Sequence, residues 1–543
     1  MSALRNLERG LSLYYTDSMA LRKLPIGIQD FESLRTGGCV YVDKTAYIYK
    51  LAHEGKPYFL GRPRRFGKSL FLSTLKAYFQ GRKDLFEFLA ISELEKEWIK
   101  YPVFHIDLNV ANYNSAAALE SGLDINLRYL EEKWGRDVEE TTSSSRFLGL
   151  IHRASEKSGK KVVVLIDEYD QPLLQTMDDP PLQDELRREL RAFYGILKTA
   201  DPWLQFIFLT GVTQFSQVSI FSGFNQLQDI SMNSGYAGIC GISESELTGN
   251  FDGELRELAE ANSMTYEQAL AEMQKRYNGY HFCENSEGIF NPFSVLNTFS
   301  SRKFAYYWFR TGTPTFLANQ FRKANFDPRD FSGNLLTFDE ESIINYRAGS
   351  GSLIPILYQS GYLTIKDYDR DSNLYTLGFP NEEVEYGFLN ALFPLYGPQG
   401  ADTQEFFIGK FFVDLQKGDV DAFMTRLRAF FAAIPYELND QTERHYQTLF
   451  YLVFTLMGQY TRAEVRSAQG RADAVVFTKD TVYVFEFKLA QNESADLRDD
   501  ALKQIDSKGY LIPYTAGSRR LVKIGAQFNA DTRTLGNWKM VIF

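Results

Sequence analysis

The chain has 543 residues, of which 44% are hydrophobic, 24% charged and 15% aromatic, and its formal net charge at pH 7 is −10. This length exceeds what one hydrophobic core usually serves, so we expect several domains. The negative charge argues against a protein that coats nucleic acid without sequence preference, although a local basic groove remains compatible with it. Three scattered cysteines (Cys39, Cys240 and Cys283) have no C-x-x-C spacing, which indicates neither a disulfide framework nor a zinc site.

Residues 1–23 form an N-terminal arm that mixes charges and has no sustained apolar run. No segment of the chain approaches the roughly 18 apolar residues that a membrane-spanning helix needs. We therefore expect a soluble, cytoplasmic protein without a membrane partner.

The stretch LGRPRRFGKS at 60–69 joins a short apolar strand to a helical pattern that begins at Lys68. With Gly61 before the turn and Gly67 after it, the backbone N–H groups can surround a phosphate at the positive end of a helix. Lys68 can reach the β and γ oxygens, and the Ser69 hydroxyl can bind magnesium. The sequence therefore predicts a phosphate loop, with ATP and Mg²⁺ as cofactors.

The spacing of this loop departs from the usual pattern. Five residues, instead of four, separate Gly61 from the Gly-Lys pair, and Arg62 stands where the first glycine is expected. A basic connection between a strand and a helix is therefore the alternative. Arg64 and Arg65 are candidates for phosphate contact, or for an arginine finger, by their position alone.

The segment 162–170, VVVLIDEYD, opens with five aliphatic residues, which is typical of a strand buried on both faces of a parallel sheet. Asp167 and Glu168 follow at its carboxyl end, where α/β proteins place their ligands. Asp167 would hold magnesium, and Glu168 would polarise the attacking water. An acidic turn that only leaves the core is the alternative.

Further apolar strands at 103–108 and 206–212 alternate with helical patterns, which predicts an α/β fold with a parallel sheet covered on both faces. Thr213 follows the second of these strands and is a candidate sensor of the γ-phosphate, with strand capping as the alternative. The polar stretch at 215–229 is expected to be a functional loop or a short helix. We expect 24–240 to form one P-loop ATPase domain, similar to ATPases of the AAA-like kind.

The middle of the chain, 241–396, combines helical patterns with short aromatic helices and hairpin-like pieces. This mixture predicts a helical lid followed by a winged-helix-like module. The stretch GPQGADT at 397–403 reads as a linker. A C-terminal α/β domain is then expected at 404–543.

Two strand-like runs at 471–478 and 482–488, separated by a Lys-Asp turn, predict an antiparallel hairpin. Alternation puts Glu486 and Lys488 on one face, and antiparallel pairing brings Asp473 beside them. Two carboxylates and a lysine suit metal-assisted phosphodiester cleavage: Asp473 and Glu486 would bind magnesium, and Lys488 would orient or deprotonate the nucleophile. A surface salt bridge worth at most about 1 kcal/mol is the alternative.

A helix predicted at 494–508 puts Gln504 on the stripe that packs against the sheet. Glu464 and Glu443 are further candidate ligands, for which an exposed helper charge is the alternative. Strands near the C-terminus complete a helix, mixed-sheet, helix core.

The chain resembles bacterial and archaeal proteins that join an AAA-ATPase-like N-terminal domain to a C-terminal PD-(D/E)xK nuclease domain. The motifs behind this resemblance are LPIGIQDFESLR, YVDKT, GRPRRFGKS, VVVLIDEYD and LTGVTQFSQVSIFSG, then RYNGYHF and NPFSVL, and finally GRADAVVF, VFEFK and ALKQI. Together they cover nearly everything after the arm. This family writes its phosphate loop as RPRRFGKS, so the unusual spacing is itself shared.

The resemblance implies a role for each site residue. The implied residues are Lys68 and Ser69 for phosphate and magnesium, Asp167 and Glu168 for magnesium and water, and Asp473, Glu486, Lys488 and Gln504 for the D…ExK signature with its helical glutamine. Such proteins are often associated with mobile elements or with defence against foreign DNA.

The leading expectation is an ATP-hydrolysing switch or motor that controls a magnesium-dependent nuclease, with DNA favoured over RNA as the substrate. The rival is a signalling or assembly ATPase whose nuclease-like domain only binds nucleic acid or a partner. A homo-oligomer is compatible with both. A nucleotide kinase is disfavoured, because the Asp167-Glu168 pair suits hydrolysis by water.

Overall fold

The computed structural model describes most of the chain, which forms two compact units. The described residues are 22–55, 57–213, 227–308, 336–344, 353–396, 408–434, 443–458, 463–465, 473–490, 496–529, 532 and 534–543. The first unit comprises Met1–Thr311 and Asn334–Glu383, and the second comprises Gly312–Gly333 and Val384–Phe543. Residues 1–21 of the predicted arm and the predicted linker lie outside the described residues. The domain boundaries at 240 and 396 stay predictions.

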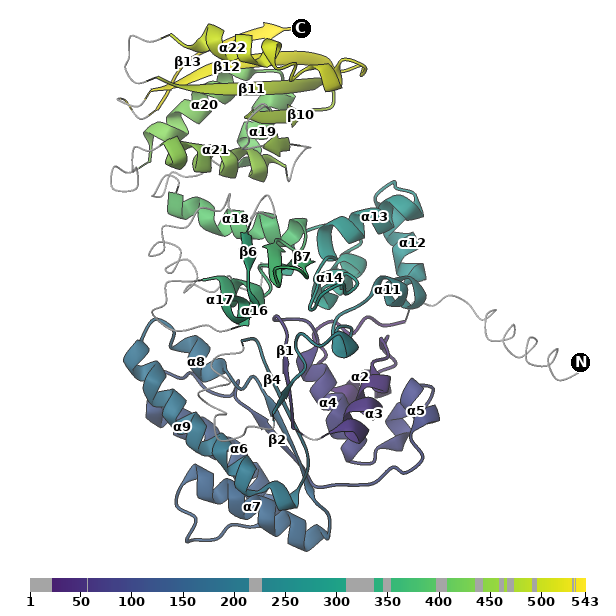
Figure 1. The fold of residues 1–543 in the computed structure, drawn as a ribbon. Coiled ribbons are helices and arrows are strands. Elements are labelled where there is room, and N and C mark those ends of the chain that lie inside the picture. The colour runs from purple at the N-terminus through teal and green to yellow at the C-terminus, as the bar shows by residue number, and fades with distance from the viewer. Residues whose placement is uncertain are drawn as a thin grey trace, which may run out of the picture. The chain divides into compact units, whose positions relative to one another are not determined.

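A five-stranded parallel sheet in the order β2-β3-β4-β1-β5 organises the first unit (Figure 1). The strands are β1 (Pro57–Gly61), β2 (Val103–Asp107), β3 (Val162–Asp167), β4 (Leu204–Gly211) and β5 (Gln228–Asp229), and every neighbouring pair is parallel. All residues of β3 are buried, as its aliphatic run requires. The α/β fold with a parallel sheet is confirmed.

Parallel pairing brings the carboxyl ends of these strands to one edge of the sheet. Gly61 at the end of β1 pairs with Gly211 at the end of β4. Asp107 at the end of β2 pairs with Asp167 at the end of β3. The segments that follow these strands therefore start side by side.

Helices cover both faces of this sheet (Figure 1). On one face lie α2 (Phe31–Thr36), α3 (Thr45–Glu54), α4 (Lys68–Phe79) and α5 (Ala90–Leu94), and on the other lie α6 (Ala116–Trp134), α7 (Ser143–Ser158), α8 (Gln171–Gln175) and α9 (Pro180–Thr199). The longest of them, α9, begins where Asp179 accepts a hydrogen bond from the backbone N–H of Leu182, and the first helical position is a proline, which has no N–H to leave unpaired. Short 3₁₀ turns are η1 (Lys83–Phe86), η2 (Asp201–Trp203) and η3 (Ser234–Tyr236).

The strand β5 was not expected from the sequence. Its two residues pair with Tyr58 and Phe59 of β1 at the edge of the sheet, within the stretch predicted to be a loop or a short helix. Two residues are too few for a periodic pattern, so only the pairing reveals this strand. Residues 214–226 of the same stretch lie outside the described residues.

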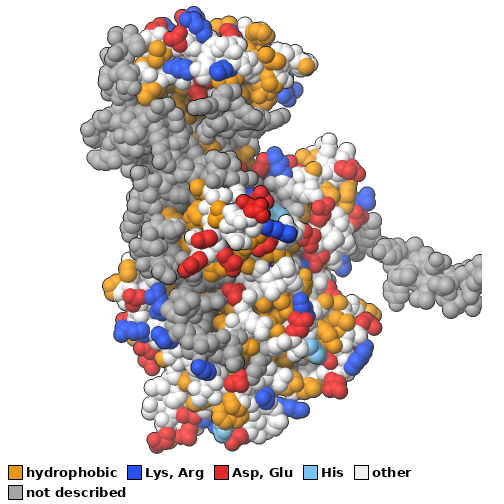
Figure 2. Space-filling model, in the orientation of Figure 1, with side chains coloured by type: hydrophobic (Ala, Val, Ile, Leu, Met, Phe, Trp, Pro, Cys, Tyr) orange, Lys and Arg blue, Asp and Glu red, His pale blue; other side chains and the backbone are white. Residues whose placement is uncertain are grey.

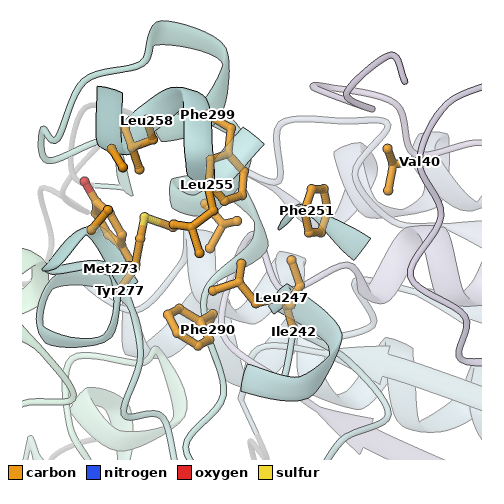
Figure 3. Close-up of a cluster of buried hydrophobic side chains, with 13 residues drawn as sticks. Val40, Ile242, Leu247, Phe251, Leu255, Leu258, Met273, Tyr277, Phe290 and Phe299 are labelled. Atoms are coloured by element: carbon orange, nitrogen blue, oxygen red, sulfur yellow. The ribbon is translucent and has the colours of Figure 1, made fainter. Parts of the chain in front are cut away.

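Four helices of the middle region share a buried apolar cluster (Figure 3). They are α11 (Glu244–Asn250), α12 (Asp252–Ala261), α13 (Tyr266–Tyr277) and α14 (Pro292–Ser301). Leu255, Met273 and Phe299 come from three of them, and Val40 joins from the segment before α3. The helical part of the middle region is thereby packed onto the N-terminal segment.

The rest of the middle region is a small α+β module. Its antiparallel sheet has the order β6-β8-β7. The elements are β6 (Leu336–Phe338), α16 (Glu340–Ile344), α17 (Ile354–Gln359), β7 (Thr364–Asp369) and β8 (Leu374–Gly378). Helix α18 (Glu382–Tyr396) follows and carries the chain from the first unit into the second.

The second unit is built on a mixed sheet in the order β13-β12-β11-β10-β9, in which only β11 and β12 run parallel. Its strands are β9 (Ala463–Val465), β10 (Ala474–Phe477), β11 (Thr481–Ala490), β12 (Arg520–Asn529) and β13 (Thr534–Ile542). Helices α19 (Ile408–Gln416), α20 (Val420–Ala432) and α21 (Glu443–Met457) cover one face, and α22 (Arg498–Ser507) covers the other (Figure 1), with a 3₁₀ turn η8 (Ile512–Tyr514) after it. The predicted C-terminal α/β core is confirmed.

The visible surface of the described residues carries acidic, basic and hydrophobic side chains interspersed (Figure 2). Within the described ranges, no helix combines the length and the apolar character that crossing a membrane requires.

Candidate nucleotide and nuclease sites

The predicted phosphate loop connects the end of β1 to the start of α4. Gly61 is the last residue of the strand, and its backbone N–H donates to the Ser231 hydroxyl at 2.7 Å. Gly67 precedes the first residue of α4 in a left-handed conformation, with φ +95°. Because a side chain disfavours this region, glycine is required where the chain turns into the helix. The helix N-terminus and its unpaired N–H groups therefore lie next to the loop.

Lys68 is held within this loop, with only 4% of its surface exposed. Its Nζ donates to the backbone carbonyls of Arg62 at 3.1 Å and Pro63 at 3.3 Å, and lies 3.8 Å from the Glu168 carboxylate. Ser69, half-buried, is the second residue of α4. The buried Lys68 ammonium, which now donates to loop carbonyls, can donate the same hydrogen bonds to phosphate oxygens.

The arginines of the loop have different surroundings. Arg62 is 1% exposed; its guanidinium donates to the carbonyls of Ser231 at 2.7 Å and Tyr236 at 3.0 Å and lies 4.0 Å from the centre of the Phe282 ring. Burial lowers the pKa of Arg62. The Arg62 side chain therefore fixes the start of the loop to Ser231 and Tyr236 and is part of the buried packing of the first unit.

Arg64 and Arg65 are exposed, in contrast to Arg62. Arg65 adopts φ +70°, which is uncommon for a residue with a side chain, and its guanidinium lies 4.9 Å from the centre of the Phe293 ring. Both side chains are accessible to a ligand at the loop.

The two carboxylates after β3 are placed differently. Asp167 is 4% exposed and accepts hydrogen bonds from the Thr210 hydroxyl and from the backbone N–H of Glu168. Glu168 has φ +50° and a side chain 22% exposed, directed toward Lys68. An unfavourable backbone conformation in a non-glycine residue is a feature that clusters at functional sites.

Asp107 is a carboxylate at this edge that sequence reasoning missed. It ends β2 directly beside Asp167 in the parallel register. Burial, followed by the nearby Asp167 charge, raises its pKa. Only the pairing of β2 with β3 brings the two carboxylates together, so the sequence pattern gave no signal for it.

Asp170 is a second residue that was missed, although it is the last letter of VVVLIDEYD. It is fully buried and accepts hydrogen bonds from the backbone N–H groups of Val212 and Thr213 and from the Thr213 hydroxyl. Burial first, and then the charge of Glu168, raise its pKa to about 6. The Thr213 hydroxyl thus points at Asp170, and contact with a γ-phosphate remains a prediction.

An apolar pocket lies beside the phosphate loop. Its lining includes Gly67 and Leu70 from the loop and α4, Pro25 and Val40 from the N-terminal segment, and Ile239. Gly67, which directly precedes α4, therefore lines both the phosphate loop and this pocket.

The hairpin β10–β11 sets the geometry of the second site. Ala474 pairs with Phe485, so the preceding residue, Asp473, lies beside Glu486. The Asp473 carboxylate accepts a hydrogen bond from the backbone N–H of Phe487 at 2.8 Å. This is the juxtaposition that the strand pattern predicts.

Glu486, Lys488 and Gln504 form one hydrogen-bonded group between β11 and α22. The Gln504 amide donates to Glu486 Oε1 and its oxygen accepts from Lys488 Nζ, which lies 3.4 Å from Glu486 Oε1. Glu486 is 2% exposed, and burial, followed by the charge of Asp473, raises its pKa to about 7. Its other oxygen, Oε2, is buried and has no hydrogen-bond partner within the described residues.

The opposite face of β11 packs against α21. Phe485 and Phe487 pack against Phe450 and Phe454 of α21, with ring centres between 4.1 and 6.2 Å apart. The alternation predicted for this strand is therefore observed. Glu464 lies in β9 opposite Val475, but the side chains of Glu464 and Glu443 lie outside the described part of the structure.

The chain matches known proteins along nearly its whole length. A family model described as a predicted AAA-ATPase matches residues 25–221, and a model of the PD-(D/E)XK nuclease superfamily matches residues 441–538. An uncharacterized protein in the vnfD 5′ region of Azotobacter chroococcum mcd 1 is 35% identical over 527 residues, which cover 95% of this chain and 98% of that protein. A solved structure of the Aeropyrum pernix ORC2 protein, in ADPNP–ADP complexes, aligns with 64% of this chain and 93% of its own at 9% identity, with a TM-score of 0.24 that is too low to support an argument. The chain belongs to the family of predicted AAA-ATPases that carry a C-terminal domain of the PD-(D/E)XK nuclease superfamily.

Proposed function

We propose that this protein binds and hydrolyses ATP, and that its nucleotide state controls a magnesium-dependent nuclease that acts on DNA. The observation that supports this most is the buried carboxylate Glu486, whose Oε2 has no hydrogen-bond partner among the described residues, beside Asp473 and Lys488. A buried, unsatisfied carboxylate oxygen is costly unless something binds it. Because the family joins such a carboxylate site to a domain with a phosphate loop, nucleotide binding at that loop is the proposed control of the nuclease.

At the first site, the phosphates of ATP lie along the loop that ends at Gly67. Lys68 exchanges its bonds to the loop carbonyls for bonds to phosphate oxygens, and the N-terminus of α4 contributes backbone N–H groups. The adenine ring enters the apolar pocket next to Leu70 and Ile239.

Hydrolysis at this site uses the carboxylates after β3. Asp167 and the Ser69 hydroxyl would hold magnesium, and Asp107, which pairs with Asp167 in the sheet, would add a carboxylate beside them. Glu168 orients the attacking water and accepts its proton. Asp170 holds the backbone of Val212 and Thr213, and thereby keeps the neighbouring strand end fixed against Glu168.

At the second site the residues fit a divalent cation. Asp473 and the free oxygen of Glu486 offer carboxylate ligands, which Mg²⁺ prefers. When bound, magnesium supplies a Lewis acid for the phosphodiester and lowers the pKa of water. Lys488 contributes a positive charge at the edge of the carboxylate pair, and Gln504 orients both Glu486 and Lys488.

The biological role is proposed from family resemblance alone. Defence against foreign DNA or mobile-element biology would both employ a nuclease that stays inactive until its ATPase is engaged.

The nuclease half is tested by measuring cleavage of single- and double-stranded DNA and RNA, together with ATP turnover. Asp473→Ala and Lys488→Ala should abolish cleavage and leave ATP turnover intact. If the wild type cut no substrate with magnesium or manganese in any nucleotide state, the nuclease would be excluded. A change of assembly with ATP in the absence of cleavage would instead support an assembly ATPase.

A further inference from the structure

The phosphate loop touches the middle region of the first unit through its exposed residues. The backbone carbonyl of Arg64 accepts a hydrogen bond from the indole Nε1 of Trp308 at 3.3 Å. The next residue, Arg65, lies over the Phe293 ring. Two successive loop residues are therefore held by side chains more than two hundred positions away in the sequence.

A second set of contacts fixes the same corner. The Trp308 ring packs edge-on against Tyr362, with centres 5.2 Å apart. At the preceding residue, Gly361, an added Cβ would lie 2.7 Å from the Cβ of Pro63 in the loop. Trp308 thus sits between the loop and the small α+β module, with little room to move independently of either.

The backbone of Trp308 is bound to a buried carboxylate. Glu383 is 1% exposed. Its Oε1 accepts hydrogen bonds from the backbone N–H groups of Tyr307 and Trp308, the latter at 2.9 Å, and its Oε2 accepts from the Ser294 hydroxyl at 2.6 Å. Leaving a buried carboxylate without its donors is costly, so these groups are expected to keep their bonds when the surrounding structure shifts.

Glu383 belongs to the first turn of α18, the helix that carries the chain into the second unit at Val384. The path from the loop carbonyl to this helix is therefore short. It contains one indole N–H, one peptide N–H and one carboxylate.

We propose that Trp308 and Glu383 couple the phosphate loop to the first turn of α18, so that nucleotide binding at the loop changes the local stability of this helix, which leads to the nuclease unit. The proposal rests on the proposed function and names the regulatory connection within it. Phosphate binding reorients the peptide groups of the loop, the Arg64 carbonyl among them. Because that carbonyl holds the Trp308 side chain and Glu383 holds the Trp308 backbone, the change passes to α18.

Trp308→Phe tests this connection, because it removes the indole N–H and keeps an aromatic ring against Tyr362. The first readout is hydrogen exchange of the backbone amides in 382–396 with and without ATP. We expect ATP to change this exchange in the wild type, and the change to shrink by about three- to tenfold in the variant, the factor that losing one hydrogen bond implies. The second readout is the ratio of DNA cleavage rates with and without ATP, which should fall by the same factor while ATP turnover stays within about twofold of wild type.

Trp98→Phe is the matched control. The indole Nε1 of Trp98 is buried in the first unit and has no hydrogen-bond partner within the described residues, so this change should leave both readouts at wild-type values. Glu383→Gln, which keeps a carbonyl acceptor for the two N–H groups, guards against a variant that fails to fold and should retain most of the coupling.

Three outcomes overturn the proposal: no effect of ATP on exchange at α18 in a wild type that binds ATP, an undiminished effect in Trp308→Phe, or an equal loss in Trp98→Phe. Failure of the proposed nuclease looks different, because the exchange response would persist without any cleavage. A wild type that does not bind ATP would overturn both ideas together.

Discussion

At the scale of single residues, two buried carboxylates of the first unit differ in what holds them. Glu383 accepts only from uncharged donors, two backbone N–H groups and a hydroxyl. Asp170 also accepts from backbone N–H groups and a hydroxyl, but it lies near the charges of Glu168 and Lys68. Both are therefore sensitive to the loss of a single donor.

Glu383 should make stability depend on pH. Burial raises its pKa to about 7 from the ordinary 4.5. Since the folded state favours the protonated carboxyl, its contribution to stability is fully present below about pH 4.5 and is lost as the pH rises through about 7. Glu383→Gln cannot ionise, so the variant should gain stability relative to the wild type between about pH 5 and about pH 8, by at most about 3 kcal/mol. Thermal unfolding across this range measures the difference, and a difference that does not vary with pH would contradict the assignment.

The Thr213 hydroxyl should stabilise the first unit through Asp170. Thr213→Val keeps the shape of the side chain and removes the donor, leaving a buried carboxylate short of one bond, which should cost about 1 to 3 kcal/mol. Thr213→Ser retains the hydroxyl and is the matched control. Thermal unfolding of both variants measures how much stability each substitution removes. Destabilisation by Thr213→Val that is no greater than that by Thr213→Ser would contradict a stabilising role for the hydroxyl.

Arg65 is predicted to sense the γ-phosphate, because it is an exposed residue of the phosphate loop. Arg65→Gln should weaken binding of ATP more than binding of ADP, by about tenfold if one charge-assisted hydrogen bond is lost. Titration calorimetry with both nucleotides measures the two affinities. Equal losses for ATP and ADP would contradict the prediction.

At the scale of elements, the sequence predicted those strands whose pattern is set by burial. The aliphatic run of β3 and the alternation along β11 both reflect which faces are covered, so they could be interpreted without the structure. The two-residue strand β5 has no such pattern. Pairing with their neighbours extends strands β12 and β13 beyond their apolar residues, which the sequence pattern alone does not indicate.

The same distinction applies to the candidate sites: residues placed by local pairing could be predicted, and residues placed by distant segments could not. Asp473, Glu486 and Lys488 follow from one strand and its hairpin partner, and such local pairing can be inferred from the sequence. Asp107 depends on the pairing of strands more than fifty residues apart. In the sequence Arg62 is one of three arginines in the loop, but its burial against Ser231 and Phe282 depends on segments far along the chain.

Helix α22 should matter to cleavage through Gln504, which bridges Glu486 and Lys488. Gln504→Leu removes both bonds and should reduce the DNA cleavage rate by about 10- to 100-fold, as is typical when an orienting partner is lost. The matched control is Lys503→Ala, the adjacent residue on the same helix, which is exposed. Comparable rates for Gln504→Leu and the wild type would contradict a positioning role.

Considering the whole molecule, the two candidate sites lie in different units, and α18 is a described helix that carries the chain from the first unit into the second. The family to which the chain belongs joins the same two domains. We therefore propose that nucleotide binding at the phosphate loop of the first unit controls the activity of the carboxylate site in the second.

The most direct test is to measure the DNA cleavage rate and the ATP turnover rate together for wild type, Lys68→Ala and Lys488→Ala, each with ATP, with ADP and without nucleotide. We predict that the wild type cleaves at rates that depend on the nucleotide, that Lys488→Ala hydrolyses ATP without cleaving, and that Lys68→Ala loses both ATP turnover and the nucleotide dependence of cleavage. Nucleotide control would be contradicted if the wild type cleaved DNA at one rate in all three nucleotide conditions and Lys68→Ala cleaved at that same rate.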